Sequence, residues 1–285
     1  MRRTPVIHLR GVDCALAQAI LERLLRARVD IVVPQSSLEY YRERYSVELD
    51  FGDCTLYGSN ERLLEGGHRL FLLGQGPFNL LSDGESGLDV DGLEVVLALP
   101  GHTGFEVEYD WIDALVLVHD LLPRAKDPDW ESPLFPEWMR CLKSGLQPNA
   151  GVSEHWWVSD VDVADAMVRI LLSNEPFSKR ISVSGRRSWP EKQTLVELSM
   201  LYNRTMAGRT GQFSVEHLTA APTPVIELQP LTVSPQLPMS IEENANARPD
   251  LSPLHDLLHR IDGDGWRPLI PIRTALMHAL ADYMD

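Results

Sequence analysis

The sequence has few cysteines, few lysines and no long run of apolar residues. Its three cysteines, Cys14, Cys54 and Cys141, are odd in number and far apart, so they offer no zinc-binding spacing and fit a reducing compartment. No apolar stretch approaches the length that a helix needs to cross a bilayer. The segment from Met1 to Pro5 leads into a predicted strand rather than a secretory leader. We therefore expect a cytoplasmic protein with no membrane insertion.

Positive charge is also scarce. The formal net charge is −15 at pH 7, and a chain with this charge repels the phosphate backbone of nucleic acids. The basic clusters, Arg42 with Arg44 and Arg186 with Arg187, are too small to overcome that repulsion, so we expect no nucleic-acid partner. Hydrophobic residues nevertheless make up 44% of the 285 residues, which is enough for a full globular core.

The first residues of the chain carry the pattern of a parallel sheet. A short apolar strand is predicted over 5–9, a helix with Leu16, Ile20 and Leu24 on one face over 15–28, and a β-branched strand over 29–33. This order implies a right-handed crossover between parallel strands. Further strands are predicted at 47–51, 69–73, 94–99, 156–159 and 180–184, and helices at 60–64, 111–122, 136–144, 162–173, 191–202 and 272–283.

Three later segments carry motifs in a recognisable order. In the first, from His155 to Ala166, an aromatic-valine strand runs into Asp-Val-Ala; the second is the strand from Ile181 to Gly185. The third combines Asp-Leu-Ser at 250–252 with Gly-Trp-Arg-Pro at 265–268. Together they resemble the extended short-chain dehydrogenase/reductase family, the group of nucleotide-sugar epimerases and dehydratases.

The resemblance implies an α/β fold, a Rossmann-like doubly wound parallel sheet with a smaller C-terminal lobe. We place the Rossmann-like core at 1–189 and the lobe at 190–285, with a proline-rich connector over 220–250 and the terminal helix after it.

The dinucleotide motif of that family is incomplete in this chain. The family's Gly-x-x-Gly-x-x-Gly turn falls on Gly11, Cys14 and Ala17, and Cys14 places a side chain where the pyrophosphate would approach the backbone. Asp13 adds a carboxylate that can cap the helix and repel an anion. After the second strand, Gln35 replaces the acid that binds ribose.

Some cofactor-site positions remain, because Gly52-Asp53 matches the family's pair after the third strand. The degenerate site consists of Gly11, Val12, Leu16, Gln35, Asp53 and Pro100. From these residues we expect no cofactor, or weak NAD(P) binding.

The family's catalytic pair is a tyrosine with a lysine four residues later, and none of the four lysines has a tyrosine at that position. Tyr40 and Arg44 have the spacing but follow the wrong strand. The best remaining acid/base candidate is His102, in the turn after the strand at 94–99, acting with Asp160 or Asp110.

A metal centre is not expected. His255 and His259 lie four residues apart, but no third fixed ligand accompanies them.

These observations leave three hypotheses. The first is a catalytically degenerate protein of this fold that acts as a scaffold, regulator or assembly subunit, with a protein partner and a possible homodimer. The second is an atypical NAD(P)-dependent epimerase or reductase on a small-molecule or nucleotide-sugar substrate. The third is a non-redox cyclase or isomerase in a biosynthetic pathway that uses His102 and an aspartate.

Overall fold

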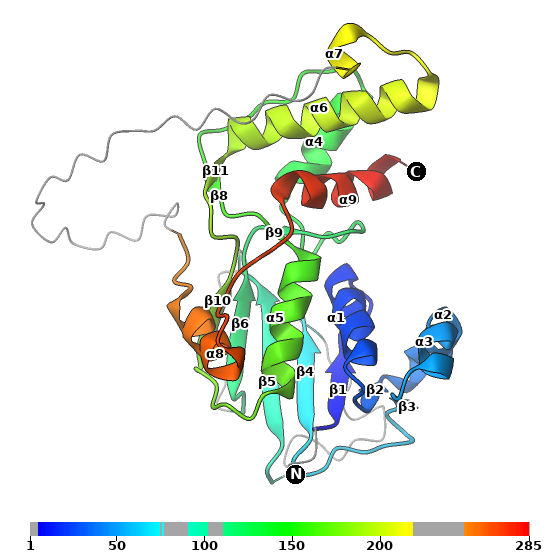
Figure 1. The fold of residues 1–285 in the computed structure, drawn as a ribbon, viewed down its shortest axis with the longest axis vertical. Helices are drawn as coiled ribbons and strands as arrows, with labels where there is room; N and C mark the ends of the chain where they lie inside the picture. The colour runs from blue at the N-terminus through cyan, green and yellow to red at the C-terminus, as the bar shows by residue number, and fades with distance from the viewer. Residues whose placement is uncertain (1–4, 75, 77–90, 102–110, 219–247, 285) are drawn as a thin grey trace, which may run out of the picture.

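The computed structural model describes residues 5–74, 76, 91–101, 111–218 and 248–284 (Figure 1). Its centre is a seven-stranded sheet with the order β10-β6-β5-β4-β1-β2-β3, and every neighbouring pair is parallel. The strands are β1 (Ile7–Arg10), β2 (Ile31–Val33), β3 (Leu56–Gly58), β4 (Arg69–Leu73), β5 (Glu94–Pro100), β6 (Ala114–Val118) and β10 (Arg180–Val183). Sequential strands run outward in opposite directions from β1, which places a topological switch point between β1 and β4. The predicted α/β, Rossmann-like fold is confirmed.

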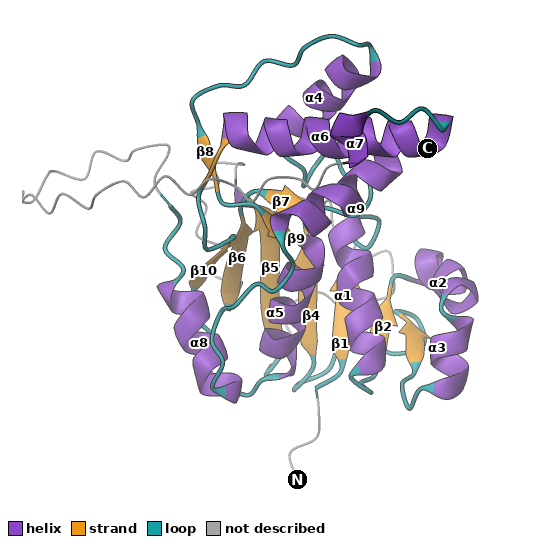
Figure 2. Ribbon diagram, turned by 45° about the horizontal axis from the view of Figure 1, so that its top comes forward, coloured by secondary structure: helices purple, strands orange, loops and turns teal. Residues whose placement is uncertain are grey.

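Three helices cover one face of this sheet: α1 (Ala15–Arg26), α5 (Asp160–Leu172) and α8 (Ser252–Asp262) (Figures 1 and 2). Their apolar faces form one core cluster with alternate residues of the strands, such as Leu9, Phe71 and Val116. The strands are continuous apolar runs because both of their faces are buried. The cluster on the other face, which includes Leu70, Leu97 and other strand or turn residues, contains no residue of a described helix.

A second hydrophobic cluster lies above the carboxyl edge of the sheet (Figure 2). It joins α4 (Leu134–Lys143), α6 (Glu191–Thr210) and α9 (Ile272–Met284). Two small ladders enter this region, β8 (Glu154–His155) with β11 (Trp189–Pro190) and β7 (Leu121–Leu122) with β9 (Val158–Ser159). α4 belongs to the upper cluster although it precedes residue 189, and α8 packs on the sheet although it follows that residue, so the chain passes between the two regions more than once. The predicted boundary between a core and a C-terminal lobe at residue 189 stays a prediction.

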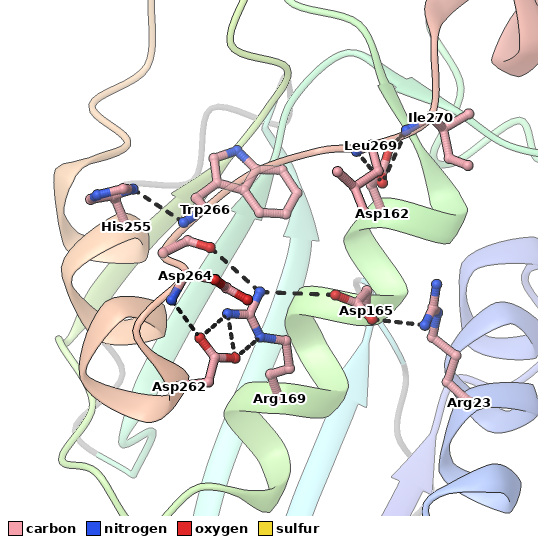
Figure 3. Close-up of polar contacts among 11 residues, drawn as sticks. Arg23, Asp162, Asp165, Arg169, His255, Asp262, Asp264, Trp266, Leu269 and Ile270 are labelled. Atoms are coloured by element: carbon pink, nitrogen blue, oxygen red, sulfur yellow. Dashed lines mark hydrogen bonds and ion pairs between the residues drawn. The ribbon is translucent and has the colours of Figure 1, made fainter.

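The C-terminal segment is fixed to α5 by polar contacts (Figure 3). Arg169 binds both carboxylate oxygens of Asp262, at 2.5 and 2.6 Å. Asp162 accepts hydrogen bonds from the backbone N–H groups of Leu269 (2.8 Å) and Ile270 (3.1 Å). These contacts hold the connection from α8 to α9 against α5.

Trp266 adds a buried contact in the same segment. Its indole N–H donates to the carbonyl of Ser184 at the end of β10, at 2.8 Å. The Gly-Trp-Arg-Pro element therefore completes the core beside the edge strand β10.

Three predicted elements differ from the structure. Residues 47–51 belong to α3 (Ser46–Phe51), which follows α2 (Leu38–Arg44), and the place beside β2 is taken by β3 instead. The segment 60–64 forms turns rather than a helix. The predicted helix 111–122 is wrong because Ala-Leu-Val-Leu-Val is an unbroken apolar run that fills β6, and β7 follows it.

None of the helices among the described residues is long and apolar enough to span a bilayer. The predicted connector at 220–250 falls almost entirely outside the described residues. A short helix, α7 (Val215–Leu218), precedes it at the far end of α6 (Figure 1).

Candidate functional site

A cavity of about 390 Å³ lies where the sheet meets the upper cluster. Its walls come from the ends of β5 and β6, the start of α4, and the strand β8. The lining residues are Gly101, His119, Asp120, Leu121, Trp130, Ser132, Pro133, Leu134, Ser153, Glu154, His155, Trp156 and Pro249. This is the carboxyl edge of a parallel sheet, where open α/β proteins bind their ligands.

The cavity wall contains a histidine-aspartate pair. His155 Nδ1 lies 2.9 Å from Asp120 Oδ1, and the backbone N–H of Trp156 donates to Asp120 Oδ2 at 2.7 Å. The imidazole also stacks on Trp157, with ring centroids 4.5 Å apart and planes inclined by 19°. His155 Nε2 has no hydrogen-bond partner among the described residues. The ring is therefore fixed at one nitrogen, and the other is buried without a partner.

Backbone geometry holds Asp120 in an unusual position. Its φ of 49° is in the left-handed region, which aspartate tolerates better than most residues. The Asp120 carbonyl accepts a hydrogen bond from Val158 N at 3.0 Å. The turn after β6 thus directs the carboxylate to His155, and strained residues of this kind gather at functional sites.

A second histidine, His119, packs closely on the neighbouring turn. A Cβ added at Gly101 would lie 2.2 Å from His119 Nδ1, so glycine is needed there for the approach. Pro100 ends β5 directly before this glycine and pairs in register with Val118. The turn after β5 therefore forms part of the cavity wall, although only its first residue is described.

The two predicted catalytic residues are not brought together in the described structure. His102 lies outside the described residues. Asp160 is fully buried at the start of α5 and does not line the cavity. Its carboxylate accepts from the backbone N–H and the Nε of Arg124, at 3.2 and 3.1 Å, and Arg124 also pairs with Glu22. The contacts of Asp160 are those of a structural ion pair.

Sequence reasoning missed the pair of His155 and Asp120. The two residues are 35 positions apart, and residues 111–122 were assigned to a helix, which hides the significance of Asp120. Once β6 is recognised as a strand, Asp120 lies just past its carboxyl end. That position is the sequence signal that could have identified Asp120 as a site residue.

The predicted dinucleotide turn has one intact feature. Gly11 has φ +73°, and a Cβ there would lie 2.0 Å from the carbonyl oxygen of Leu73, so only glycine fits. The first amides of α1, however, are already bound by side chains of the chain. Asp127 Oδ2 accepts from Ala15 N at 2.9 Å, and Cys14 Sγ accepts from Ala17 N at 3.3 Å.

The carboxylate at this helix end is therefore Asp127 and not Asp13, which is exposed. Burial raises the pKa of the Cys14 thiol to about 12, so this side chain stays protonated. The residues present do not fit a pyrophosphate at the α1 N-terminus while Asp127 occupies it.

The other predicted cofactor positions are dispersed. Val12 is buried and its carbonyl accepts from the Tyr41 hydroxyl at 2.6 Å, and Leu16 belongs to the core. Gln35 follows β2 as expected, and its Oε1 is buried without a hydrogen-bond partner among the described residues. Asp53 precedes β3 instead of following it, because the predicted third strand is a helix.

At that position Asp53 lies at the amino edge of the sheet and forms an exposed ion pair with Arg28 at 3.2 Å. The sequence match of Gly52-Asp53 therefore does not place an adenine contact at the carboxyl edge, where the turns after β1 and β2 lie.

The histidines of α8 have structural partners. His255 Nδ1 accepts from Trp266 N at 3.1 Å, and His259 Nδ1 lies 2.7 Å from the carbonyl oxygen of Gly263. No group of three or more potential metal ligands occurs within the part of the chain that the structure describes.

No family model matches the chain, and no curated protein matches its sequence. Solved structures do resemble its fold. UDP-glucuronic acid 4-epimerase from Bacillus cereus, in complex with UDP-4-deoxy-4-fluoro-glucuronic acid and NAD, has a TM-score of 0.54 at 11% identity and matches 98% of this chain and 99% of its own.

Two further structures give similar values. UDP-glucose 4-epimerase from Thermotoga maritima, with UDP-glucose, has a TM-score of 0.51 at 9% identity, covering 98% of both chains. A reductase engineered to attenuate substrate inhibition in asymmetric catalysis has a TM-score of 0.52 at 12% identity, covering 99% of this chain and 100% of its own. The fold is that of the extended short-chain dehydrogenases/reductases.

This similarity corrects the cofactor prediction. The expectation of no cofactor, or at most of weak NAD(P) binding, came from the incomplete glycine turn and from Gln35 in place of the ribose-binding acid, and its first part is overturned. The Bacillus cereus epimerase, which shares the fold over nearly the whole chain, contains NAD in two solved complexes. The chain therefore shares its fold with a protein that contains this dinucleotide, and the incomplete glycine turn is not enough to exclude a cofactor.

Proposed function

We propose that the chain is an enzyme that isomerises or epimerises a small polar substrate by proton transfer in the sheet-edge cavity. The observation that carries this proposal is the pair of Asp120 and His155, in which one imidazole nitrogen is held and the other has no partner among the described residues. Neighbours of the same fold are epimerases and a reductase, which favours the enzymatic hypotheses over a scaffold.

Each residue of the pair has a distinct role. An ionised carboxylate only accepts hydrogen bonds, so Nδ1 of His155 carries the proton that faces Asp120. Nε2 is then the lone-pair nitrogen, and it removes a proton from the substrate. Asp120 is a positioning residue that stabilises the imidazolium formed in this step. Stacking on Trp157 restricts rotation of the ring.

The bond changes balance without an added oxidant. Nε2 takes the proton from a carbon next to a carbonyl group, and the electron pair of the C–H bond moves to the carbonyl oxygen as an enolate. Return of the proton to the other face inverts the carbon. Where that carbon carries a hydroxyl group, the hydroxyl proton passes to the enolate oxygen, and return of the carbon-bound proton to the adjacent carbon then moves the carbonyl.

The cavity walls indicate the charge of the substrate. Asp120 and Glu154 contribute carboxylates, and no lysine or arginine is among the described lining residues. Trp130 and Trp156 offer apolar surface of the kind that packs on sugar rings. A neutral hydroxylated carbonyl compound fits this wall better than a phosphate ester.

The test is deuterium incorporation from D₂O into carbon, followed by mass spectrometry. The substrates are free ketoses and aldoses and small hydroxyketones. His155→Gln should lower the exchange rate by about 10² to 10⁴, the usual contribution of a general acid/base. Asp120→Asn should also lower it.

His217→Gln is the control, because His217 lies in α7, far from the cavity. Equal rates for wild type and His155→Gln, or no exchange by wild type on any of these compounds, would rule the proposal out. A protein partner and a homodimer stay predictions.

A further inference from the structure

Two histidines are buried against each other on the face of the sheet opposite to α1 and α5. His8, the second residue of β1, is 0% exposed, and His68, which directly precedes β4, is 7% exposed. His8 Nε2 lies 3.0 Å from His68 Nδ1, and the ring centroids are 5.1 Å apart. The residues beside His8 in register are Val32 and Leu70, which are apolar and fully buried. The pair therefore lies away from water.

The hydrogen bond between the rings fixes where their protons lie. His68 Nε2 faces the Glu65 carboxylate at 3.8 Å and so carries a proton, which leaves His68 Nδ1 as the acceptor and His8 Nε2 as the donor. His8 Nδ1 is then a lone-pair nitrogen, and it has no hydrogen-bond partner among the described residues. A proton added there would create a buried N–H without an acceptor, and a proton added at His68 Nδ1 would break the bond between the rings. The arrangement suits only two neutral imidazoles.

The charges around the pair also oppose protonation. Arg10 lies two residues further along β1, Arg62 follows β3, and both place positive charge near His8. Of the nearby carboxylates, Asp30 is already paired with Arg62 at 2.7 Å, and the side chain of Glu65 is 72% exposed, so that water screens it. Burial, and to a lesser extent the positive neighbours, lower the pKa of His8 from 6.5 to about 3.

The second histidine of the pair is attached to a turn with two consecutive glycines. Gly66 and Gly67 directly precede His68, and Gly67 has a φ of +82°. The N–H of Gly67 donates to the Gly92 carbonyl at 2.8 Å, and the N–H of Glu94 donates to the His68 carbonyl at 3.2 Å. Glycine changes its backbone angles more freely than other residues, so this turn can act as a hinge beside the pair.

We propose that the His8–His68 pair is an acid-sensitive latch, which holds the turn 65–68 closed while both rings are neutral and releases it when one of them is protonated. Opening breaks the two backbone hydrogen bonds of the turn and lets water reach the rings. Because the folded pKa of His8 is lowered, the closed form has its full stability above pH 6.5 and loses it as the pH falls from there toward about 3. The latch lies at the amino edge of the sheet, opposite to the cavity, and does not depend on proton transfer by His155.

The experiment is hydrogen–deuterium exchange of the full-length protein, measured by NMR for each amide and corrected for the effect of pH on the chemical exchange rate. Protection of the Gly67 and Glu94 amides should fall about tenfold between about pH 7.5 and about pH 5.5, because the open form takes up a proton with a pKa near 6.5. In His8→Gln the fall should be less than about twofold, since glutamine does not titrate. His217→Gln is the matched control, with the same change in α7, and it should lose protection as wild type does.

The amides of α5 distinguish a local opening from unfolding of the whole protein. At about pH 5.5 they should be at least about tenfold better protected than those of Gly67 and Glu94, because the latch opens while the core stays folded. If His8→Gln does not fold, His68→Gln replaces it. The ¹⁵N signals of the histidine rings in wild type should also show that both imidazoles of the pair are neutral at about pH 7.5.

Four results would overturn the proposal. The first is protection in the turn that does not change with pH, and the second is the same acid-induced loss in a folded glutamine variant of the pair. The third is protection in α5 no higher than in the turn, and the fourth is a protonated ring in the pair at about pH 7.5.

Discussion

The substitution Asp162→Ala tests how the C-terminal segment is attached to α5. Asp162 is buried near the start of that helix, and its carboxylate accepts the backbone N–H groups of Leu269 and Ile270. Alanine removes both acceptor oxygens. The connection between α8 and α9 should then loosen.

The expected cost follows from the two lost bonds. A hydrogen bond contributes about 1 kcal/mol net, and more when the acceptor is charged. Both N–H groups lie in a partly exposed segment, so water recovers some of the loss. Burial raises the pKa of Asp162, which shows that its charge carries a desolvation cost, and alanine removes this cost. We expect a loss of about 2 kcal/mol, or roughly 4–8 °C in the thermal midpoint.

Thermal and urea unfolding, followed by circular dichroism, measure this loss. Asp165→Ala is the matched control, because Asp165 lies on the same helix and pairs with Arg23 at 2.7 Å while its side chain is 45% exposed. Exposed ion pairs contribute about 0–1 kcal/mol, so the control should lose less than 1 kcal/mol. Equal losses in the two variants would show that the bonds to Leu269 and Ile270 do not anchor the segment.

Three further predictions concern the turns and the capping carboxylate. In urea unfolding, Gly11→Ala should destabilise the fold by about 1–3 kcal/mol more than Gly145→Ala. Both glycines have positive φ, but only at Gly11 would an added Cβ meet a backbone oxygen. Equal losses of stability in the two variants would contradict this close approach. Gly101→Ala should displace His119, which lines the cavity, and so lower deuterium exchange there; an unchanged rate would show that the exchange does not depend on the position of His119. Burial raises the pKa of Asp127 above its unfolded value near 4, so its contribution to stability is complete below that pH and is lost as the pH rises through the folded pKa. Wild type should therefore lose stability relative to Asp127→Asn on going from pH 4 toward neutrality, and a constant difference would refute this sign.

Much of the fold could be predicted because most strands of the sheet are local apolar patterns with clear ends. The strand at β4 and the helix at α5 were both visible in the sequence, the second with its acidic first turn. The strand β6 was not, because Leu115, Val116 and Val118 satisfy helical as well as strand spacing. Only the neighbouring strands β5 and β10 decide between the two.

The candidate site was less predictable, since its contacts join distant segments. Nothing near Asp127 in the sequence indicates that it caps α1, and Asp13, which is adjacent to that helix, was the natural choice. The pairing of His155 with Asp120 depends likewise on the placement of β8 above the end of β6. Local motifs identify the fold, whereas the chemistry at its edge depends on the tertiary arrangement.

The return of the chain from the upper cluster to the sheet has a consequence for biosynthesis. Leu254, Leu257 and Trp266 complete the core beside β10, and Leu276 and Leu280 complete the upper cluster. Both hydrophobic clusters are therefore incomplete until residues near the C-terminus have been synthesised. Until then, part of the apolar surface of the sheet stays uncovered. A nascent chain that stops before residue 251 should expose that apolar surface, so a stalled or truncated product is expected to be a substrate for chaperones and proteases rather than a stable smaller domain.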